Sequence, residues 1–439
     1  MPPRRTTVSP SKFLGLAGVC ALLGAPACDG DGTQADLPTC PAGQSCVAVS
    51  ASGGEGALSS AFAQAKDGQL VLLGAGTYKM TNTLALQANG ITVRGAGIDK
   101  TILDFSGQRA GSEGVFAQNV QNLTLEGFTV ADPPGNAVKV LNGTGVILRK
   151  LKAIWNGSEA SAHGPYGLYP VQSKNVLIED CVAVGASDAG IYLGQSQKAV
   201  LRRNEAYGNV AGLEVENTFE ADVYENKTHD NTGGILVFDL PGLQQLGGHG
   251  VRVFKNEMFD NNLDNFAPKG NTVGLVPRGT GFFVMANTDV EVFDNTFRNN
   301  KTANSAIISY FVTDETIKDP SYYPYPSKIH VHDNRYEGGG DAPDLKRQIG
   351  ILLSTAMTKF PGGKVPALSY DGIVDDKRQG PTDNRMQICA KNNVGFSFTN
   401  LHLDKLDKNK PNLPDILTTD AAPYDCALPP LPAVSFPGL

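Results

Sequence analysis

The sequence predicts an all-β fold, a parallel β-helix in which a single chain winds through coils of about 22 residues. A short phrase that usually ends in Asn recurs along the chain, as at Asn204 and Asn226. Successive phrases are 22 or 23 residues apart at the closest, and 30 or 39 apart elsewhere, where loops are inserted. The chain also contains 50 Gly among 439 residues and only 18% charged residues. This composition suits many short strands joined by tight turns.

Each phrase is itself the end of a predicted strand. The residues five and three positions before its end are apolar in all eight repeats, as with Ala199 and Leu201 before Asn204, whereas the position between them is mixed. Such period-two alternation indicates a strand with one face turned inward. Three strands per coil, stacked at about 4.8 Å, place like residues above like.

The recurring Asn residues are predicted to form a structural ladder. An amide can donate to one neighbouring coil and accept from the next, and Asn tolerates the sharp corners between strands. This ladder comprises Asn204, Asn226, Asn256, Asn295 and Asn334, with Asn392 in one further coil. A second ladder, five residues later, comprises Asn156, Asn209, Asn231, Asn261 and Asn300. Cys181 occupies a position of the first ladder and is expected to be a packed free thiol.

The N-terminus has the pattern of an export signal. A basic region, a short apolar stretch and a small-residue cleavage site occupy residues 1–27. Cleavage after Ala27 exposes Cys28, which is either lipidated, as in bacterial lipoproteins, or the first residue of a simply secreted protein. Residues 28–52 are expected to be a flexible tether, and 53–439 a single β-helix domain. A helix near 56–66 would cap the open edge of its first coil.

The cysteines and the net charge limit which cellular compartment and which kinds of partner fit the chain. We expect disulfides Cys40–Cys46 and Cys389–Cys426, which suit an oxidising compartment such as the periplasm or the cell surface. The formal net charge is −7, and it becomes −10 without residues 1–27, which carry three basic and no acidic residues. An acidic exported chain without a basic stripe is a poor nucleic-acid binder. A lipid anchor would then be its only membrane attachment.

The third strand of each coil is the best candidate for a functional surface. Long inserted loops precede and follow it, so the strand column would form the floor of a groove. Its aromatic rings, amides and carboxylates suit a polysaccharide. The predicted ligand-binding residues are Tyr169, Tyr192, Gln195, Glu214, Glu216, Asn217 and Asp239.

Catalysis is a second interpretation of the same face. Glu214 and Glu216 point the same way from one strand and Asp188 lies at the preceding corner, so these three are the catalytic candidates. They could also hold Ca²⁺, the one cofactor that the sequence suggests; no metal site is otherwise implied. A lyase or epimerase needs a base as well, and Tyr169, Tyr192, His163 and Arg278 are the available residues. Alternatively, the acids are solvated or hold the inserted loops.

Three phrases carry a resemblance to a known family. "SDAGIYLGQSQ" (187–197), "NVAGLEVENT" (209–218) and "GGILVFDLPGL" (233–243) closely resemble bacterial exported right-handed parallel β-helix repeat proteins, many of them lipoproteins. The resemblance implies the right-handed form of the fold. It supplies no catalytic residues, because the family's function is unassigned. It also implies a partner, since members are similar to proteins paired with an exported c-type dihaem cytochrome.

Two classes of function follow from the sequence. The first is a cell-envelope binding or scaffold protein whose groove takes a polysaccharide or an envelope protein. The second is a polysaccharide lyase, epimerase or glycoside hydrolase acting on acidic glycans. The sequence favours the first, because no complete acid–base set assembles from it.

Overall fold

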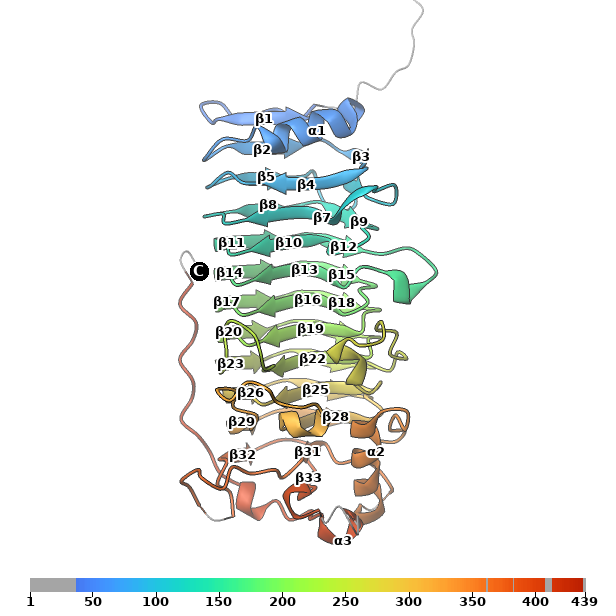
Figure 1. Ribbon diagram of the computed structural model, residues 1–439, viewed down its shortest axis with the longest axis vertical. Coiled ribbons are helices and arrows are strands. Elements are labelled where there is room, and N and C mark those ends of the chain that lie inside the picture. Colours follow the sequence, from blue (N-terminus) through green and yellow to red (C-terminus); the bar gives the residue numbers. More distant parts are fainter. Residues whose placement is uncertain (1–36, 361, 382, 407–412, 437–439) are drawn as a thin grey trace, which may run out of the picture. The chain divides into compact units, whose positions relative to one another are not determined.

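The computed structural model describes residues 37–439, apart from 361, 382, 407–412 and 437–439. The predicted export signal and Cys28 lie outside the described residues. From residue 37 onward the chain forms a parallel β-helix with three parallel sheets, called A, B and C, as predicted (Figure 1). Each full coil contributes one strand to each sheet in the order A, B, C.

Sheet A contains twelve strands: β1 (Cys46–Val49), β2 (Leu70–Leu73), β5 (Thr92–Arg94), β8 (Thr124–Glu126), β11 (Thr144–Arg149), β14 (Lys174–Glu179), β17 (Gln197–Arg202), β20 (Phe219–Tyr224), β23 (His249–Phe254), β26 (Thr288–Phe293), β29 (Ser327–His332) and β32 (Ile388–Lys391). Sheet B contains β3 (Gly76–Lys79), β6 (Thr101–Asp104), β9 (Thr129–Ala131), β12 (Lys152–Ile154), β15 (Val182–Val184), β18 (Glu205–Tyr207), β21 (Lys227–His229), β24 (Glu257–Phe259), β27 (Thr296–Arg298) and β30 (Arg335–Glu337).

Sheet C carries the third strand of each coil: β4 (Asn82–Leu86), β7 (Ala110–Gln118), β10 (Val138–Leu141), β13 (Tyr166–Val171), β16 (Ala189–Gly194), β19 (Ala211–Glu216), β22 (Gly233–Phe238), β25 (Thr280–Met285), β28 (Ala303–Ile308), β31 (Leu368–Tyr370) and β33 (Phe398–Asn400). The described helices are α1 (Gly54–Ala63), α2 (Gln348–Thr355) and α3 (Leu413–Ile416).

The core lies between the three sheets and follows the predicted columns. In sheet A, Ala199 pairs with Ala221 and Leu201 with Val223, so apolar residues stack above apolar residues from coil to coil. These inward side chains are fully buried. Burial of this continuous core is the main source of stability, because no coil could cover its own apolar face alone.

Both Asn ladders form inside the corners of the coils. In the first, the side-chain amides of Asn204, Asn226, Asn256 and Asn295 each donate to the side-chain oxygen of the ladder Asn in the next coil, at 2.9–3.0 Å. Each amide also donates to a backbone carbonyl, as Asn204 does to Ile178. The ladders are therefore structural. Cys181 lies in the predicted place, buried and free, and its backbone N–H donates to Asn204.

Two ladder positions differ from the prediction. Asn334 donates to Asn393, so Asn393 rather than Asn392 continues the first ladder. Asn392 has a φ of 55° and makes the corner itself. Asn156 is exposed and donates to the Asp132 carboxylate instead of joining the second ladder. The insertion that follows Asn156 takes the place of a tight corner there, so the described second ladder begins at Asn209, which accepts from the Ala186 N–H.

The first coil is covered by α1, close to the expected helix. Structured chain begins earlier than the expected end of the tether at residue 52, because Cys46–Val49 already pairs with β2 as the first strand of sheet A. The Cys40–Cys46 disulfide is present at the start of this strand, as predicted.

The C-terminal segment returns along the outer face of sheet A (Figure 1). The predicted Cys389–Cys426 disulfide fastens it to β32. Beyond the disulfide, the backbone N–H groups of Leu431 and Val434 donate to Glu291 and Asp222, both on sheet A. Its last described side chain, Phe436, packs on two buried residues of that sheet, Leu177 and Val200. Among the described residues, no helix is long and apolar enough to span a membrane.

Candidate functional site

The outer face of sheet C has the register that the sequence predicts. Tyr192 of β16 pairs with Glu214 of β19, and Glu214 pairs with Leu236 of β22. Two positions along the same strands, Gly194 pairs with Glu216, and Glu216 with Phe238. The predicted column of outward side chains is therefore continuous across the middle coils.

The face changes character along its length. From β22 to β28 its outward side chains are apolar and buried beneath two inserted loops, residues 262–279 and 309–326, with Ile349 of α2 packed against them. The apolar side chains that pack together here include Leu236, Phe238, Phe283, Met285, Ala306 and Ile308 on the sheet, and Val273, Val276, Tyr310, Val312 and Tyr322 in the loops. This part of the predicted groove floor is covered.

At β13 to β19 the face lines an open recess of about 390 Å³. Its polar lining comes from Asp188, Glu214 and Glu216, with Tyr166 beside them. The 262–279 loop supplies Asn271 and Thr272 on the opposite side. The structure thus brings the three predicted catalytic candidates together in one recess, and we call these three residues the acidic cluster.

Three tyrosines pack beside the acidic cluster. The ring centroids of Tyr166 and Tyr169 lie 4.4 Å apart with the rings nearly parallel. Tyr192 is tilted against both, at 4.8 and 4.7 Å. Tyr166 and Tyr169 are half-buried, whereas Tyr192 is buried. Partly exposed aromatic rings next to polar groups are suited to contact a sugar ring.

A glycine lets one of these tyrosines reach the cluster. Gly194 leaves an open space on the outer face, and a Cβ there would lie 1.9 Å from the Tyr192 hydroxyl. The Tyr192 ring therefore folds over Gly194 toward Glu216, the residue paired with Gly194, and hydrogen-bonds its carboxylate. Glycine inside a strand often marks such a close approach.

Asp188 is held from two sides. The Tyr166 hydroxyl donates to its Oδ2 at 3.2 Å, and the Asn271 amide donates to the same oxygen at 3.5 Å. These contacts join β13, the corner before β16 and the 262–279 loop. The loop contact shows why sequence patterns alone could not place Asn271, which lies 83 residues beyond Asp188.

Burial keeps protons on the acidic cluster. It raises the pKa of Asp188 to about 7, against the hydrogen bonds from Tyr166 and Asn271. Burial, with the negative charge of Asp188 and Asp239, raises the pKa of Glu216 to about 7, although the Tyr192 hydrogen bond opposes this. Burial and the charges of Asp188 and Glu216 raise the pKa of Glu214 well above its ordinary range. The cluster therefore retains at least one proton near neutral pH.

Glu214 has the driest environment of the three. It is 2% exposed, and its Oε1 has no hydrogen-bond partner among the described residues. It lines both the open recess and a small apolar cavity of about 30 Å³ beneath the 262–279 loop. No Lys, Arg or His in the described part of the chain forms an ion pair with any of the three acids.

The tyrosines are hydrogen-bond donors rather than bases. Burial and the nearby carboxylates raise the pKa of Tyr169 to about 12, and they raise the pKa of Tyr166 and of Tyr192 further. A tyrosine that removes a proton from a sugar carbon needs a lowered pKa. The other proposed bases lie elsewhere: the His163 ring bonds the carbonyls of Gly185 and Gly157, and Arg278 pairs with Asp264.

The remaining predicted ligand residues lie at the other end of the strands. Asn217 and Asp239 hold the 240–248 loop: Asn217 donates to Leu240 and Gln245, and Asp239 accepts from two backbone N–H groups. Burial raises the pKa of Asp239 to about 6, opposed by these two N–H groups. Gln195 lines a second recess of about 390 Å³, whose other side chains are mostly amides: Asn142, Gln172, Gln197, Gln244 and Gln245.

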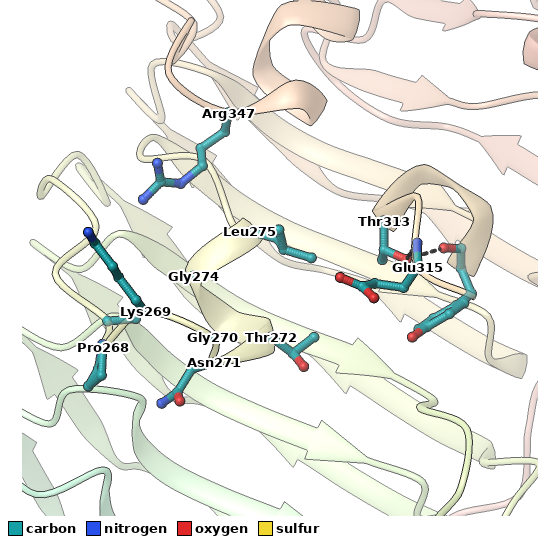
Figure 2. Close-up of a pocket in the computed structure, with 12 residues that line it drawn as sticks. Pro268, Lys269, Gly270, Asn271, Thr272, Gly274, Leu275, Thr313, Glu315 and Arg347 are labelled. Carbon is teal, nitrogen blue, oxygen red and sulfur yellow. Dashed lines mark hydrogen bonds between the residues drawn. The ribbon is translucent and has the colours of Figure 1, made fainter. Parts of the chain in front are cut away.

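A further recess adjoins the acidic cluster on the outer side of the 262–279 loop. It has a volume of about 470 Å³ and shares Gly270, Asn271 and Thr272 with the recess at the cluster. Figure 2 shows Lys269 and Asn271 on one side of it and Glu315 on the other. The two recesses therefore meet at these three loop residues.

Sequence reasoning missed Tyr166 and Asn271. Tyr166 immediately precedes the glycine that opens the β13 phrase, and in later coils that position holds Ala189, Ala211, Gly233 and Thr280. A bulky residue at a position that is elsewhere small was the available signal. Asn271 belongs to an inserted loop without a repeat column, so no signal pointed to it.

The close group of metal-ligand side chains in the described part of the chain is not the acidic cluster. Among the described residues, only one set of three potential ligand atoms lies mutually within 4.8 Å, and this set lies on sheet A rather than in the recess.

Comparison with known proteins supports the fold. The family described as "Right handed beta helix region" matches residues 89–244, and the parallel β-helix fold is right-handed, as the resemblance implied. No curated protein matches the chain. Solved structures with similarity include the mannuronan C-5 epimerase AlgE4 A-module of Azotobacter vinelandii, at 13% identity and a TM-score of 0.42, covering 77% of this chain and 89% of that one.

Two other similar structures are polygalacturonases. The Thermotoga maritima exopolygalacturonase has 12% identity and a TM-score of 0.46, with 70% of this chain and 83% of that chain covered. Endopolygalacturonase I of Stereum purpureum has 15% identity and a TM-score of 0.41, with 64% and 93% covered. At these values the likeness carries no argument about activity or substrate.

Proposed function

We propose that this protein is a glycan-processing enzyme that cleaves glycosidic bonds at the acidic cluster. One observation carries the proposal: three buried carboxylic acids, with raised pKa values and no cationic partner, line an open recess beside partly exposed tyrosine rings. Buried acids that keep a proton near neutral pH are what general acid catalysis requires. The catalytic alternative of the sequence analysis therefore gains support over binding alone.

The three acids would have different roles. Glu214, whose pKa is raised well above its ordinary range, would donate its proton to the glycosidic oxygen as the bond to the leaving sugar breaks. Glu216 or Asp188, once ionised, would take a proton from the attacking water, whose oxygen forms the new bond to the sugar carbon. The proton that Glu214 gives up is balanced by the proton that the base receives, so the cluster as a whole keeps its charge.

The charge of the recess favours neutral polysaccharides. An acidic polymer would bring further negative charge next to three carboxyl groups that lack a cation. The Lys139 ammonium lies 5.6 Å from the Tyr169 ring centroid, but it is already paired with Glu113 at 3.4 Å. The tyrosines, whose pKa values are raised, would also be poor bases for lyase or epimerase action on uronates.

A binding protein without turnover is the second candidate. It is favoured by the amide-lined recess around Gln195, Gln172 and Gln245, because amides match sugar hydroxyls without performing chemistry. In that case the polysaccharide would lie along the strand ends, and the acidic cluster would only contact it. Export to the periplasm or the cell surface fits either function, and the cytochrome partner stays a prediction from the resemblance.

The test is a polysaccharide screen with the purified protein. New reducing ends would report hydrolysis, and ultraviolet absorbance of unsaturated ends would report elimination. We expect hydrolysis of a neutral glycan, reduced about 100- to 10,000-fold in Glu214→Gln. Glu220→Gln is the matched control, because Glu220 is exposed and lies outside the recess.

The outcomes separate the candidates. Binding of a polysaccharide with no turnover, unchanged in Glu214→Gln but lost in Gln195→Ala, would replace the enzyme proposal with the binding protein. Elimination products from uronates would contradict hydrolysis and restore the lyase alternative. Equal activity in Glu214→Gln and Glu220→Gln would remove the acidic cluster from the chemistry.

A further inference from the structure

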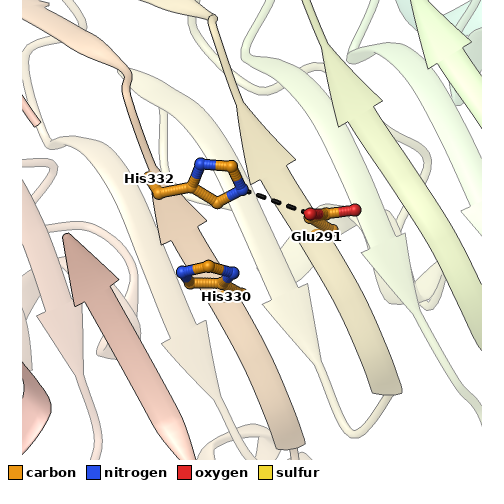
Figure 3. Close-up of side chains that lie close together, drawn as sticks. All are labelled: Glu291, His330 and His332. Carbon is orange, nitrogen blue, oxygen red and sulfur yellow. Dashed lines mark hydrogen bonds and ion pairs between the residues drawn. The ribbon is translucent and has the colours of Figure 1, made fainter. Parts of the chain in front are cut away.

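A second group of polar side chains lies on the outer face of sheet A, away from the acidic cluster. Glu291 of β26 and His330 of β29 are paired residues on neighbouring strands, and His332 is two positions along β29 on the same face (Figure 3). One potential ligand atom from each lies within 4.8 Å of the other two. Two imidazoles and one carboxylate form a common ligand set for transition metals.

His330 has no partner for either of its ring nitrogens. The residue is only 8% exposed, and neither nitrogen has a hydrogen bond among the described residues. Its ring lies 4.1 Å from the His332 ring, centroid to centroid. A buried polar group without a partner is costly, so such a group calls for an explanation. A metal ion that accepts the lone pair of one nitrogen would supply the missing partner.

His332 is oriented as a metal ligand would be. Its Nδ1 lies 2.7 Å from an Asp333 carboxylate oxygen, an arrangement that places the proton on Nδ1. Its Nε2 then directs a lone pair toward the Glu291 Oε1, 3.2 Å away. Two lone pairs facing each other require a positive centre between them, either a second proton on His332 or a metal ion. A carboxylate that holds the far nitrogen is the usual support of a histidine ligand.

Glu291 has one oxygen free for this purpose. The backbone N–H of Leu431 donates to its Oε2 at 3.1 Å, and the Arg252 guanidinium lies 3.9 Å from the same atom. The Oε1 therefore faces the histidines alone. Arg252 is a positive charge near the group, but it also pairs with Asp222 at 3.3 Å, so its charge is shared between two carboxylates.

We propose that Glu291, His330 and His332 bind a divalent late first-row transition metal, with Zn²⁺ as the principal candidate. Each ligand would contribute one atom, and a fourth position would be left for water. Because Leu431 lies against Glu291, the bound ion would sit beneath the C-terminal segment that the Cys389–Cys426 disulfide fastens to β32. The ion would join two coils and, through Glu291, support the covering segment. The proposal is independent of glycan processing.

The test measures metal binding by the purified protein carrying no histidine tag. We expect one Zn²⁺ per chain by elemental analysis after dialysis. Co²⁺ in its place should give the visible absorption spectrum that is typical of a four-coordinate site. His330→Gln and Glu291→Gln should each weaken binding by about 100-fold or more, and Asp333→Asn by about 10-fold, since it only orients His332.

The matched control is His229→Gln. His229 contacts Asp230 at 2.8 Å and Glu205 at 3.2 Å, so it has the same carboxylate neighbours as His332 but no second histidine. Its substitution should leave the stoichiometry and affinity unchanged. Circular dichroism and thermal unfolding without metal will show that each variant is folded.

Two results would overturn the proposal. One is no Zn²⁺, Co²⁺ or Cu²⁺ bound by the wild-type chain at micromolar concentration. The other is binding that survives in the folded His330→Gln and Glu291→Gln variants, which would place the ion elsewhere. Resistance of the C-terminal segment to proteolysis is the second readout, and it should increase on adding Zn²⁺ to the wild type but not to His330→Gln.

Discussion

Sheets A and C each bury a glutamate on the outer face of a central strand, and the two residues behave in opposite ways. Glu179 of β14 is 4% exposed and Glu214 of β19 is 2% exposed. Glu179 is met by three arginines, with Arg149 at 2.6 Å, Arg202 at 2.7 Å and Arg203 at 2.9 Å. Glu214 is met by two further acids and by apolar side chains.

The pKa values of the two residues follow from these neighbours. Burial would raise the pKa of Glu179, but the hydrogen bonds and charges of Arg202, Arg149 and Arg203 outweigh it, so the pKa is lowered. At Glu214, burial and the neighbouring carboxylates both raise the pKa. Glu179, near the surface of sheet A, thus belongs to an ion-pair network that joins strands, whereas the more deeply buried Glu214 of sheet C holds a proton. The difference separates a structural acid from a candidate catalytic one.

The largest expected effect is the pH dependence of stability. The unfolded chain loses the protons of Asp188 and Glu216 near their ordinary values of 3.8 and 4.5, whereas the folded chain holds them until about pH 7. Between these values the folded state binds more protons. The free energy of unfolding therefore falls as the pH rises through this window, by on the order of 3 kcal/mol. Glu179 acts oppositely, since its contribution is lost only as the pH falls through its lowered pKa.

Denaturant unfolding at about pH 5 and pH 8 checks this sign. The wild type should be less stable at the higher pH, and an Asp188→Asn/Glu216→Gln double variant should lose the part that these two acids contribute, leaving that of other raised acids such as Asp239. A wild type that becomes more stable over this range would show that the acids are ionised in the fold.

Substitution of Glu179 should give the next largest effect. Glu179→Gln leaves three guanidinium groups around a neutral amide, and removing one partner of a buried network is strongly destabilising. Because the arginine side chains are 19–40% exposed, water recovers part of the cost, and we expect a loss of about 2 kcal/mol in the free energy of unfolding. Glu220→Gln on an exposed site should change it by less than about 0.5 kcal/mol. Equal values for the two would contradict the network's role.

The sequence predicted most of the fold and about half of the site. The Asn and apolar columns repeat because each coil repeats the same environment, so the ladders, the register of sheet C and the outward direction of Tyr192, Glu214 and Glu216 could be predicted. Asn156 was misplaced because an insertion follows it. Insertions carry no repeat column, so the Asn271 contact with Asp188 and the burial of the face beyond β22 could not be foreseen.

The metal-ligand group illustrates the same limit. His330 and His332 lie in a column that alternates correctly, but sequence gives no reason to connect them with Glu291, 39 residues earlier. Register brings Glu291 and His330 together, and the C-terminal segment, far along the chain, closes over them. Neither contact has a local sequence signal.

Removal of the Tyr192 hydroxyl tests one smaller contribution to the pKa of Glu216. Tyr192→Phe deletes the hydrogen bond that lowers the pKa of Glu216 while keeping the ring over Gly194. The pKa of Glu216 should rise further, by about half a unit to one unit, and stability should fall by less than about 1 kcal/mol. Carboxyl-carbon NMR titration of the labelled protein reports the shift. A fall in this pKa would mean that the hydroxyl does not donate to Glu216.

Substitution of Glu214 should have the smallest effect on stability near neutral pH. Because its pKa lies well above the ordinary range, the wild-type side chain is already protonated there, and Glu214→Gln replaces one neutral polar group by another of nearly the same shape. We expect a change within about 0.5 kcal/mol in unfolding measurements near pH 7, against about 2 kcal/mol for Glu179→Gln. At alkaline pH the variant should be the more stable protein, since only the wild type must then bury a charge beside two others. A loss at neutral pH as large as that of Glu179→Gln would show that Glu214 is ionised and paired in the fold, and a paired carboxylate could not serve as the acid that donates a proton to a glycosidic oxygen.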